Sequence, residues 1–205
     1  MTHILKAEHL SLFRGERCLF TSIDFALESG ELLLLRGPNG SGKTSLLRGL
    51  CGLLEFEEGK ILWDGEDIGR DRQGFRARFA WYGHKTGFKA DLTAEENLGF
   101  ESALRASSGH AIRDAIDRLG LTRQRRLPVR SLSAGQQRRA SLARLLLSGV
   151  DVWVIDEPFT NLDAEGRALV EELVAEHVGR GGMAIVATHH DMLDGKNVKT
   201  LEIGQ

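Results

Sequence analysis

The stretch of this chain that most limits how it can fold is residues 37–44, which fill the pattern G-x-x-x-x-G-K-[ST]. An apolar run at residues 32–35 precedes the pattern, and apolar residues at helical spacing follow it at residues 46–54. This order predicts a buried strand of a parallel sheet, a tight glycine turn and then a helix. Glycines let the backbone N–H groups of the turn approach an anion closely, because no Cβ stands in the way. The pattern therefore predicts a phosphate-binding loop, or P-loop.

The residues of this P-loop have distinct expected tasks toward a nucleoside triphosphate. Lys43 is expected to reach the β- and γ-phosphates, and the hydroxyl of Thr44 to bind Mg²⁺. The alternative is a plain glycine turn with a solvated lysine, which the flanking strand and helix disfavour. We expect ATP to be bound by Gly37, Pro38, Asn39, Gly40, Ser41, Gly42, Lys43, Thr44 and Ser45.

Length and charge limit the class of protein. The chain has 205 residues, 41% of them hydrophobic, which suits one large domain or two closely packed lobes. Its 27 basic and 29 acidic residues leave a net charge of −2. No global positive field is therefore present to attract nucleic acid, and we expect no nucleic-acid partner.

The cysteines and the apolar runs indicate the cellular setting. Cys18 and Cys51 have no metal or redox spacing, so we interpret both as small core residues in a reducing compartment. The first residues lack the apolar core of a signal peptide, and no stretch approaches the roughly 18 apolar residues that cross a bilayer. Any action at a membrane is therefore expected to run through partners.

The remaining pattern predicts an α/β fold. Residues 92–128 contain helical signals only. A capping box at Thr93 and Glu96 begins the region, and an amphipathic helical stripe within it ends at Gly120. We expect one domain, residues 1–205, in which residues 1–91 and 149–205 form a catalytic core lobe and residues 92–148 an inserted helical lobe. Strands are expected at residues 4–13, 23–27, 32–35, 59–63, 79–82, 152–157, 183–187 and 198–203.

A second glycine motif, Leu-Ser-Ala-Gly-Gln at residues 132–136, stands directly before a helical stripe. Ser133 is a good N-cap residue, and Gly135 permits close approach to the backbone N–H groups. The motif therefore suits a second anion site. Taken alone, however, a Ser-x-Gly at a helix start is usually just a cap.

The expected strand at residues 152–157 ends in two adjacent carboxylates, Asp156 and Glu157. Burying charge at a strand end is costly unless a cation or hydrogen bonds offset it. We therefore expect Asp156 to hold Mg²⁺ through its water shell, and Glu157 to orient the attacking water as a general base. The alternative is that both carboxylates cap the next helix, which Pro158 introduces.

Two ring side chains stand at strand ends. His189 follows the strand at residues 183–187, where it can donate to a γ-phosphate oxygen or simply be solvated. Phe13 ends the first strand, where its ring can stack on an adenine base or serve as an edge core aromatic.

In this order, the motifs resemble the ATP-binding cassette (ABC) family over essentially the whole chain. The resemblance implies a P-loop NTPase fold with an ABC-type ATPase core, an inserted helical subdomain, an antiparallel β edge and hydrolysis of ATP to ADP and phosphate. It identifies Ser133, Ala134, Gly135 and Gln136 as the signature loop, Asp163 as the D-loop aspartate and His189 as the switch histidine. It also implies that Glu157 and Lys43 take part in catalysis and that Phe13 stacks on the adenine.

The resemblance also implies a second copy of the chain as a partner. In the implied head-to-tail dimer, the P-loop of one copy and residues 133–136 of the other enclose ATP. This arrangement is chemically sensible, because a transferred phosphoryl group needs donors on several oxygens at once and one P-loop supplies only one side.

The chain departs from the usual ABC pattern at two positions. His84 stands where glutamine is usual, and Ala134 where glycine is usual. Neutral imidazole is a poor ligand for a hard cation, so we do not expect His84 to ligate Mg²⁺ directly. We expect it either to act on the metal through water or to couple the chain to a membrane subunit. With Trp-Tyr-Gly-His at residues 81–84 and Gly-Phe-Lys at residues 87–89, the chain is similar to ATP-binding subunits of cytochrome c maturation, of the haem exporter type.

That second resemblance implies a peripheral ATPase on the cytoplasmic face of the inner (plasma) membrane, with separate integral membrane subunits, that drives haem export or release of a haem-loaded chaperone. No direct haem binding is expected, because the chain has neither a Cys-x-x-Cys-His motif nor a plausible axial pair. The alternative is a soluble ABC ATPase that drives an assembly step without transport.

Overall fold

The computed structural model describes residues 2–102 and 109–204, without the side chains of residues 102, 109 and 110. The chain divides into two units. The first consists of Met1–Trp81, Val150–Pro158 and Leu173–Gln205, and the second of Tyr82–Gly149 and Phe159–Glu172. The expected helical lobe, residues 92–148, lies within the second unit.

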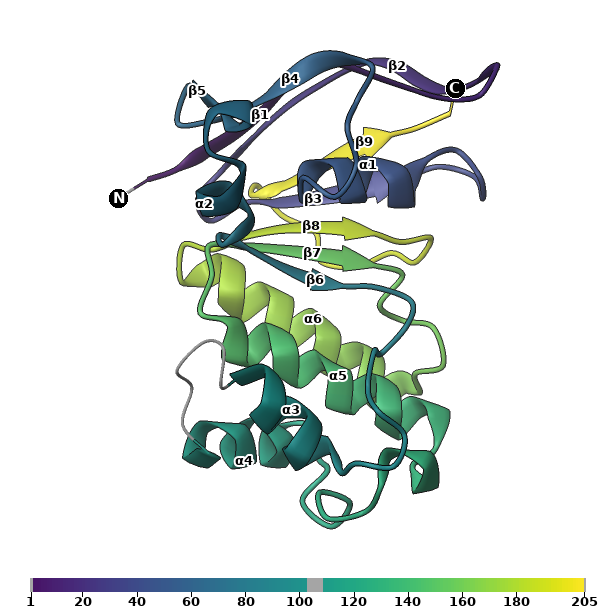
Figure 1. Ribbon diagram of the computed structural model, residues 1–205, viewed down its shortest axis with the longest axis vertical. Coiled ribbons are helices and arrows are strands. Elements are labelled where there is room, and N and C mark those ends of the chain that lie inside the picture. The colour runs from purple at the N-terminus through teal and green to yellow at the C-terminus, as the bar shows by residue number, and fades with distance from the viewer. Residues whose placement is uncertain (1, 103–108, 205) are drawn as a thin grey trace. The chain divides into compact units, whose positions relative to one another are not determined.

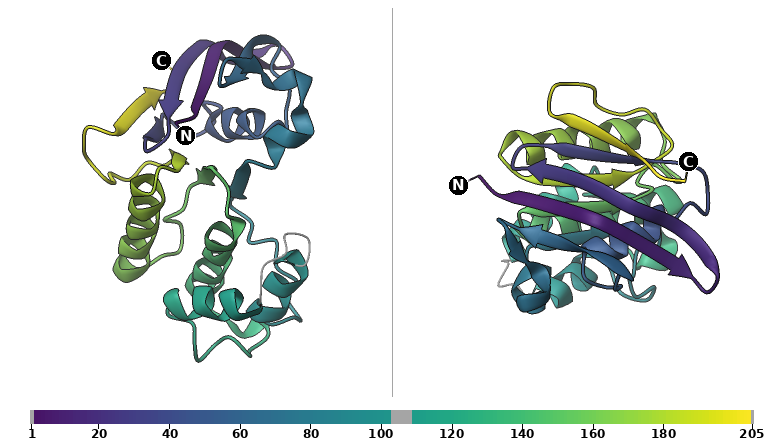
Figure 2. Two further views of the ribbon diagram at one scale, coloured as in Figure 1. Left: turned by 90° about the vertical axis from the view of Figure 1, so that its left-hand side faces the viewer. Right: turned by 90° about the horizontal axis from the view of Figure 1, so that it is seen from above.

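Two sheets build the first unit (Figure 1). The antiparallel sheet has the order β2-β1-β4-β5 and contains β1 (Ile4–Arg14), β2 (Arg17–Glu28), β4 (Glu58–Trp63) and β5 (Glu66–Asp67). Figure 2 shows β1 and β2 as a long hairpin. The other sheet has the order β6-β7-β8-β3-β9 and contains β3 (Leu32–Arg36), β6 (Phe79–Tyr82), β7 (Val152–Asp156), β8 (Met183–Ala187) and β9 (Val198–Glu202).

These strands confirm the predicted α/β fold with an antiparallel β edge. The turn at Asp64 and Gly65 joins β4 to β5, with φ of +52° and +85° at the two residues. Such positive values at both centres suit the tight hairpin turn that an Asp-Gly pair favours. β2 begins at Arg17, six residues before the predicted start of this strand, because residues 17–22 continue the pairing with β1 across irregular register steps.

The register of the parallel strands fixes where the functional loops emerge. Ala187 of β8 is the partner of both Leu35 in β3 and Asp156 in β7. The carboxyl ends of these three strands therefore meet at one edge of the sheet, where ligands bind in open α/β sheets. The loops that follow β3, β7 and β8 all start from this edge.

Burial explains the apolar runs. The four leucines of β3 are at most 2% exposed, because β3 pairs with strands on both of its sides. Helix α1 (Lys43–Leu50) contributes Leu46, Leu47 and Leu50 to a core that also contains residues of both sheets. Each such leucine stabilises the fold by about 1.5–3 kcal/mol relative to an exposed one.

The polar and basic sequence of residues 70–78 predicts a loop or an exposed helix. The structure contains a 3₁₀ turn, Ile68–Arg70, and a short helix, α2 (Arg72–Arg76). This helix is not exposed on all sides, because Phe75 is 5% exposed and its ring lies 4.5 Å from that of Phe79. One aromatic among polar neighbours is enough to attach this helix to the core.

The second unit is helical. It contains α3 (Ala94–Ser102), α4 (Gly109–Arg118), a 3₁₀ turn (Val129–Ser131), α5 (Ala134–Ser148) and the first half of α6 (Ala164–Gly179). The predicted capping box is confirmed, because the Glu96 N–H donates to the Thr93 hydroxyl at 3.1 Å and the Thr93 N–H donates to the Glu96 carboxylate at 2.8 Å. Gly120 follows α4 with φ of +71°, as a helix stop should.

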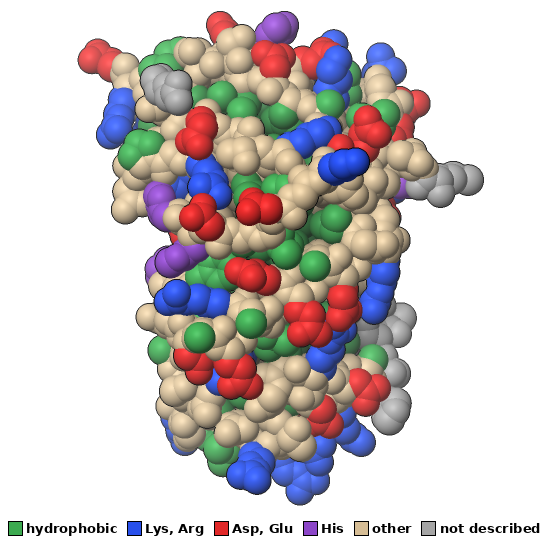
Figure 3. All heavy atoms as spheres, turned by 180° about the vertical axis from the view of Figure 1, so that it is seen from behind, with side chains coloured by type: hydrophobic (Ala, Val, Ile, Leu, Met, Phe, Trp, Pro, Cys, Tyr) green, Lys and Arg blue, Asp and Glu red, His purple; other side chains and the backbone are tan. Residues whose placement is uncertain are grey.

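Charges of both signs mix on the surface. On the face that Figure 3 shows, Lys and Arg side chains lie among Asp and Glu side chains. Within residues 2–102 and 109–204, no helix has the length and apolarity that a membrane crossing requires.

Candidate active site

The P-loop connects β3 to α1. Its glycines are required both by the backbone conformation of the loop and by the lack of room for a side chain. Gly37, Gly40 and Gly42 have φ of +142°, +81° and +102°. A Cβ on Gly37 would lie 2.1 Å from the carbonyl oxygen of Ile203, and one on Gly42 would lie 2.9 Å from the ring of Phe20. Gly42 caps α1 without a side-chain hydrogen bond, so N–H groups of the first helical turn are left for an anion.

Lys43 is folded into this loop and is 7% exposed. Its ammonium donates to the carbonyl oxygens of Gly37 at 2.7 Å and Pro38 at 3.1 Å, and lies 3.2 Å from Nε2 of His189. A buried charge persists only with such partners. The ammonium is therefore held inside the ring of loop backbone that would surround a phosphate.

The side-chain oxygen atoms of Thr44 and Asp156 lie close together at the start of α1. The Thr44 hydroxyl donates to the Asp156 carboxylate at 2.8 Å, and Asp156 is 6% exposed at the end of β7. Hydroxyl and carboxylate oxygens are the ligand types that Mg²⁺ prefers. The donor set thus fits the metal that the sequence predicts at these residues.

Glu157 has an unusual backbone conformation. Its φ is +47°, in the left-handed region that residues other than glycine rarely adopt. The conformation is held by a hydrogen bond from the Glu157 N–H to the carbonyl oxygen of Ala187, at 2.9 Å. Strain of this kind costs on the order of 1–3 kcal/mol and gathers at functional sites.

His189 meets both the P-loop and the carboxylate. Its Nε2 lies 3.0 Å from Oδ1 of Asn39, 3.2 Å from Nζ of Lys43 and 3.3 Å from Oε1 of Glu157. A single imidazole nitrogen is therefore placed between the residues predicted to bind ATP and the residue predicted to act as base.

Two cavities flank the P-loop and share Leu19, Asn39 and Gly40. One, of about 210 Å³, is lined by Arg14, Leu19, Asn39, Gly40, Gly42, Lys43, Thr44, Ser45, Asp156 and Glu157. The other, of about 420 Å³, is lined by Arg17, Cys18, Leu19, Phe20, Thr21, Ile23, Pro38, Asn39, Gly40, Ser41, Glu202 and Gly204. The first cavity contains predicted phosphate, metal and base residues together.

The β1–β2 hairpin corrects one sequence expectation and adds residues to the site. Cys18 is exposed rather than a core residue, because it lies near the hairpin tip, whereas Cys51 is buried as expected. Cys18 is the cross-strand partner of Phe13, whose ring is 39% exposed on β1. Sequence reasoning missed Arg14 and Arg17, since only the fold of the hairpin brings them to the P-loop.

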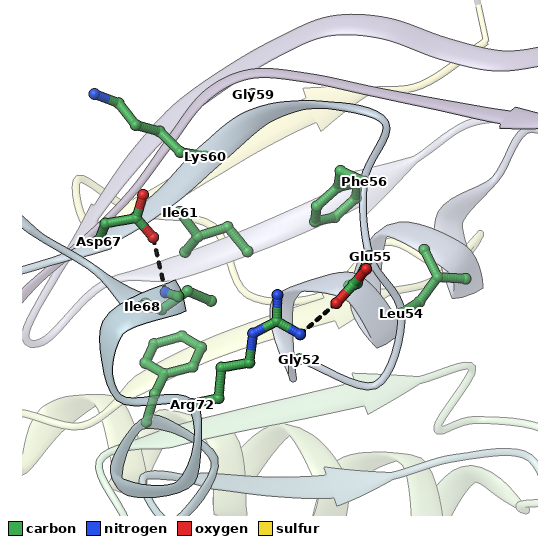
Figure 4. Close-up of a pocket in the computed structure, with 13 residues that line it drawn as sticks. Gly52, Leu54, Glu55, Phe56, Gly59, Lys60, Ile61, Asp67, Ile68 and Arg72 are labelled. Carbon is green, nitrogen blue, oxygen red and sulfur yellow. Dashed lines mark hydrogen bonds and ion pairs between the residues drawn. The ribbon is translucent and has the colours of Figure 1, made fainter.

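A further cavity of the first unit, of about 200 Å³, has none of the predicted site residues in its lining (Figure 4). Arg72 of α2 points at the carboxylate of Glu55 and forms an ion pair with it. Asp67 accepts a hydrogen bond from the N–H of Gly69 at 2.7 Å. These contacts serve the local structure of the α1 end and the β4–β5 hairpin.

The residues of the signature loop lie in the second unit. The Gln136 N–H donates to the Ser133 hydroxyl at 3.2 Å, and the Ser133 N–H donates to the Gln136 side chain at 3.0 Å. This reciprocal capping box confirms Ser133 as the N-cap of α5. Ala134 is the first helical residue, where a side chain is accommodated without strain, which explains why glycine is not required there.

Asp163 lies close to this loop in the same unit. Its Oδ1 accepts from the N–H of Gly166 at 2.9 Å, and its Oδ2 lies 3.8 Å from the guanidinium of Arg139. A Cβ on Gly135 would lie 3.0 Å from the carbonyl oxygen of Asn161. The backbone before α6 therefore packs directly on the start of α5. This close contact is possible because Gly135 has no side chain.

His84 is exposed, while the backbone around it is anchored. The guanidinium of Arg138 donates to the carbonyl oxygens of Gly83 at 2.5 Å and His84 at 3.1 Å, and lies 4.4 Å from the ring centre of Tyr82. Arg138 is 4% exposed. The loop after β6 is thus fixed from within the second unit, and the imidazole is left on the surface.

A P-loop, an aspartate–glutamate pair at the end of a buried strand and a histidine, all at the carboxyl edge of one parallel sheet, define a P-loop ATPase. The family model described as "ABC transporter" matches residues 20–160, and the chain belongs to this family. It therefore binds ATP and hydrolyses it.

The chain is similar to curated relatives over nearly its whole length. It is 41% identical over 204 residues to the "Cytochrome c biogenesis ATP-binding export protein CcmA" of Vibrio parahaemolyticus, which covers 98% of this chain and 100% of the relative. It is 46% identical over 188 residues to the protein of the same name from Methylococcus capsulatus, with 91% of each covered. The fold is similar to that of a solved ABC transporter ATP-binding protein from Pyrococcus furiosus, with a TM-score of 0.83, 22% identity and 97% of both chains covered.

These comparisons confirm the predicted family, fold and enzymatic activity. The resemblance to cytochrome c maturation subunits is confirmed as well, as a resemblance to proteins of that name. The roles of individual site residues remain predictions that the geometry makes specific.

Proposed function

We propose that this chain is the ATP-hydrolysing subunit of a membrane ABC complex for cytochrome c maturation. The observation that carries the proposal is the identity of 41–46% to relatives of that name across nearly the full length of both chains. The chain would use ATP to drive haem export or the release of a haem-loaded chaperone.

The chemistry is assigned to residues of the first unit. Lys43 and the P-loop N–H groups bind the phosphates, and Thr44 and Asp156 hold Mg²⁺, Asp156 through water. The metal, when bound, neutralises charge on the phosphate oxygens. Glu157 accepts a proton from the water that attacks the γ-phosphorus, and the bond from that phosphorus to the β-phosphate oxygen breaks to leave ADP and phosphate.

His189 is assigned a dual task that its contacts support. Its Nε2 lies within 3.3 Å of Glu157 and within 3.2 Å of Lys43, so it can position the base and donate to a γ-phosphate oxygen. Phe13 is assigned to the adenine. Its ring is partly exposed and its cross-strand partner Cys18 lines the larger cavity beside the P-loop.

The active enzyme is proposed to be a head-to-tail dimer of this chain. The first cavity supplies donors from one P-loop only, and the start of α5, with Ser133, Ala134, Gly135 and Gln136, would supply donors from a second copy. A helix N-terminus favours an anion because of its free N–H groups and partial positive charge. Asp163, which packs beside this loop, would belong to the same contact.

Contact with integral membrane subunits is assigned to the second unit, at the cytoplasmic face of the inner membrane. Phe100 is 68% exposed, and the ammonium of Lys89 lies 5.0 Å from its ring centre. An exposed aromatic beside a loop that Arg138 anchors suits a protein contact. His84 would transmit the state of the nucleotide through this loop, and haem would be handled by the partners.

Co-purification from membranes tests the proposal. A tagged chain extracted in mild detergent is expected to bring integral membrane subunits with it, and its deletion is expected to abolish covalent haem attachment to c-type cytochromes. Recovery with soluble proteins only, and normal cytochromes in the deletion strain, would instead support a soluble ABC ATPase that drives an assembly step without transport.

A further inference from the structure

The tip of the β1–β2 hairpin carries two arginines beside the P-loop. Arg14 ends β1, Arg17 begins β2, and the two are direct cross-strand partners around Gly15, whose φ is +62°. Arg14 lines the smaller cavity with Lys43, Thr44, Asp156 and Glu157. Arg17 lines the larger one, with Nη2 about 4.0 Å from the Cβ position of Gly40.

The side chains of the smaller cavity carry a net negative charge when Arg14 is left out. Its lining contains two carboxylates, Asp156 and Glu157, and one ammonium, Lys43, so these three groups alone sum to −1. A nucleoside triphosphate stays anionic even with Mg²⁺ bound, and a cavity of net negative charge would repel it. The guanidinium of Arg14 brings the sum to zero before the metal is counted.

The guanidinium is also available for a ligand. Among the described residues, no carboxylate forms an ion pair with Arg14, and its side chain is exposed at the end of β1. Arginine presents several N–H donors in a planar fork that matches phosphate oxygens, and such charge-assisted bonds are about twice as strong as neutral ones.

We propose that Arg14 is a substrate-binding residue that donates to the phosphate chain of ATP from the β1–β2 hairpin. This inference rests on the proposed placement of ATP in the P-loop. It gives the hairpin a second task besides presenting Phe13 to the adenine. Arg14 would favour nucleotides according to the charge of their phosphates rather than the identity of their base.

Equilibrium binding of a non-hydrolysable ATP analogue, ADP and adenosine to the Arg14→Ala variant tests the proposal. Loss of one charge-assisted contact is expected to weaken binding of the ATP analogue about tenfold, while adenosine binding stays within about twofold of the wild type. The loss is expected to shrink in high salt, since an exposed ionic contact is screened. Arg70→Ala removes the same charge from the exposed 3₁₀ turn after β5, whose residues line neither cavity at the P-loop, and is expected to change ATP-analogue binding by less than about twofold.

A Lys43→Ala variant separates failure of this proposal from failure of the nucleotide site. If Lys43→Ala weakens ATP-analogue binding while Arg14→Ala leaves it unchanged, the role of Arg14 is excluded and the site stands. If Lys43→Ala has no effect either, the placement of ATP in the P-loop is wrong. Equal losses for Arg14→Ala and Arg70→Ala would also overturn the role of Arg14, because they would indicate a general effect of net charge. A matching loss of adenosine binding would do the same, because it would indicate a general effect of the hairpin.

Discussion

At the residue scale, Glu157 combines a strained backbone with a carboxylate beside His189. The Glu157→Gln variant keeps the size of the side chain but removes its basicity. We expect ATP binding to be retained, a closed dimer to accumulate, and hydrolysis to fall by about 10²- to 10⁴-fold, the usual contribution of a general base. Phosphate release and size-exclusion chromatography with ATP measure both effects, and hydrolysis at the wild-type rate would remove Glu157 from this role.

His84 is a second single-residue case. Because its imidazole is exposed and the anchoring bonds of Arg138 go to backbone carbonyls, His84→Gln is expected to leave the loop intact. We expect Mg²⁺–ATP affinity to stay within about twofold, since imidazole is a poor ligand for this metal. Stimulation of ATPase activity by the membrane partners is expected to change. A large loss of Mg²⁺–ATP affinity would show that His84 acts at the nucleotide instead.

The two cysteines should differ sharply in reactivity. Burial raises the pKa of the Cys51 thiol to about 12, whereas Cys18 is exposed and lines the cavity beside the P-loop. The thiolate is the reactive form, so iodoacetamide is expected to modify Cys18 in the folded protein and Cys51 only after unfolding. ATP is expected to slow modification of Cys18. The Cys18→Ser variant is the control, and equal reaction of both thiols in the folded protein would contradict the assignment.

At the scale of elements, His177 of α6 joins this helix to the sheet. Its ring stacks on Trp153 of β7, with ring centres 4.0 Å apart and 6° between the planes, and its Nε2 lies 3.1 Å from the carbonyl oxygen of Met183. The ring also leaves no room for a side chain at Gly182, where a Cβ would lie 2.3 Å from Nε2. This residue therefore fixes the contact between α6, β7 and the start of β8.

The pH dependence of stability follows from His177. Burial lowers its pKa, so the folded state favours the neutral ring. The stability from this group is complete above the unfolded pKa of about 6.5 and is lost as the pH falls below that value toward the folded pKa. We expect the free energy of unfolding, measured with urea, to fall between pH 7 and pH 5.5 more steeply for the wild type than for His177→Gln. Parallel curves for the two proteins would rule His177 out.

Most elements could be predicted because their signals are local. The strands β6, β7 and β8 are apolar runs with clear ends, and the capping box at Thr93 and Glu96 is visible in four consecutive residues. Burial of Phe75 and exposure of Cys18 could not be predicted, because they depend on contacts with residues distant in the sequence. The same reason explains why Arg14 was missed, since its place in the cavity depends on how the hairpin meets the P-loop.

The residues of the candidate site were predicted from motifs, and the structure adds the contacts between them. Lys43, Thr44, Asp156, Glu157 and His189 come from three separate stretches of the chain, and the register of three parallel strands brings them together. Motif spacing alone identified the residues. It did not indicate that His189 contacts both Lys43 and Glu157, which is a property of the folded edge of the sheet.

At the scale of the whole molecule, each chain carries one P-loop with its own Asp156 and Glu157, and a signature loop in its second unit. Two copies are proposed to complete each other's nucleotide sites, so that ATP closes the dimer and hydrolysis reopens it. The energy of ATP would thereby become movement of the membrane subunits. The central claim is that this hydrolysis drives cytochrome c maturation.

The most direct test of this claim is covalent haem attachment to c-type cytochromes in cells whose own copy is replaced by the Glu157→Gln variant. We expect the variant still to co-purify with the membrane subunits but haem-bearing cytochromes c to be lost, while the wild-type chain restores them. Normal levels of cytochrome c with the Glu157→Gln variant would show that ATP hydrolysis by this chain does not drive cytochrome c maturation.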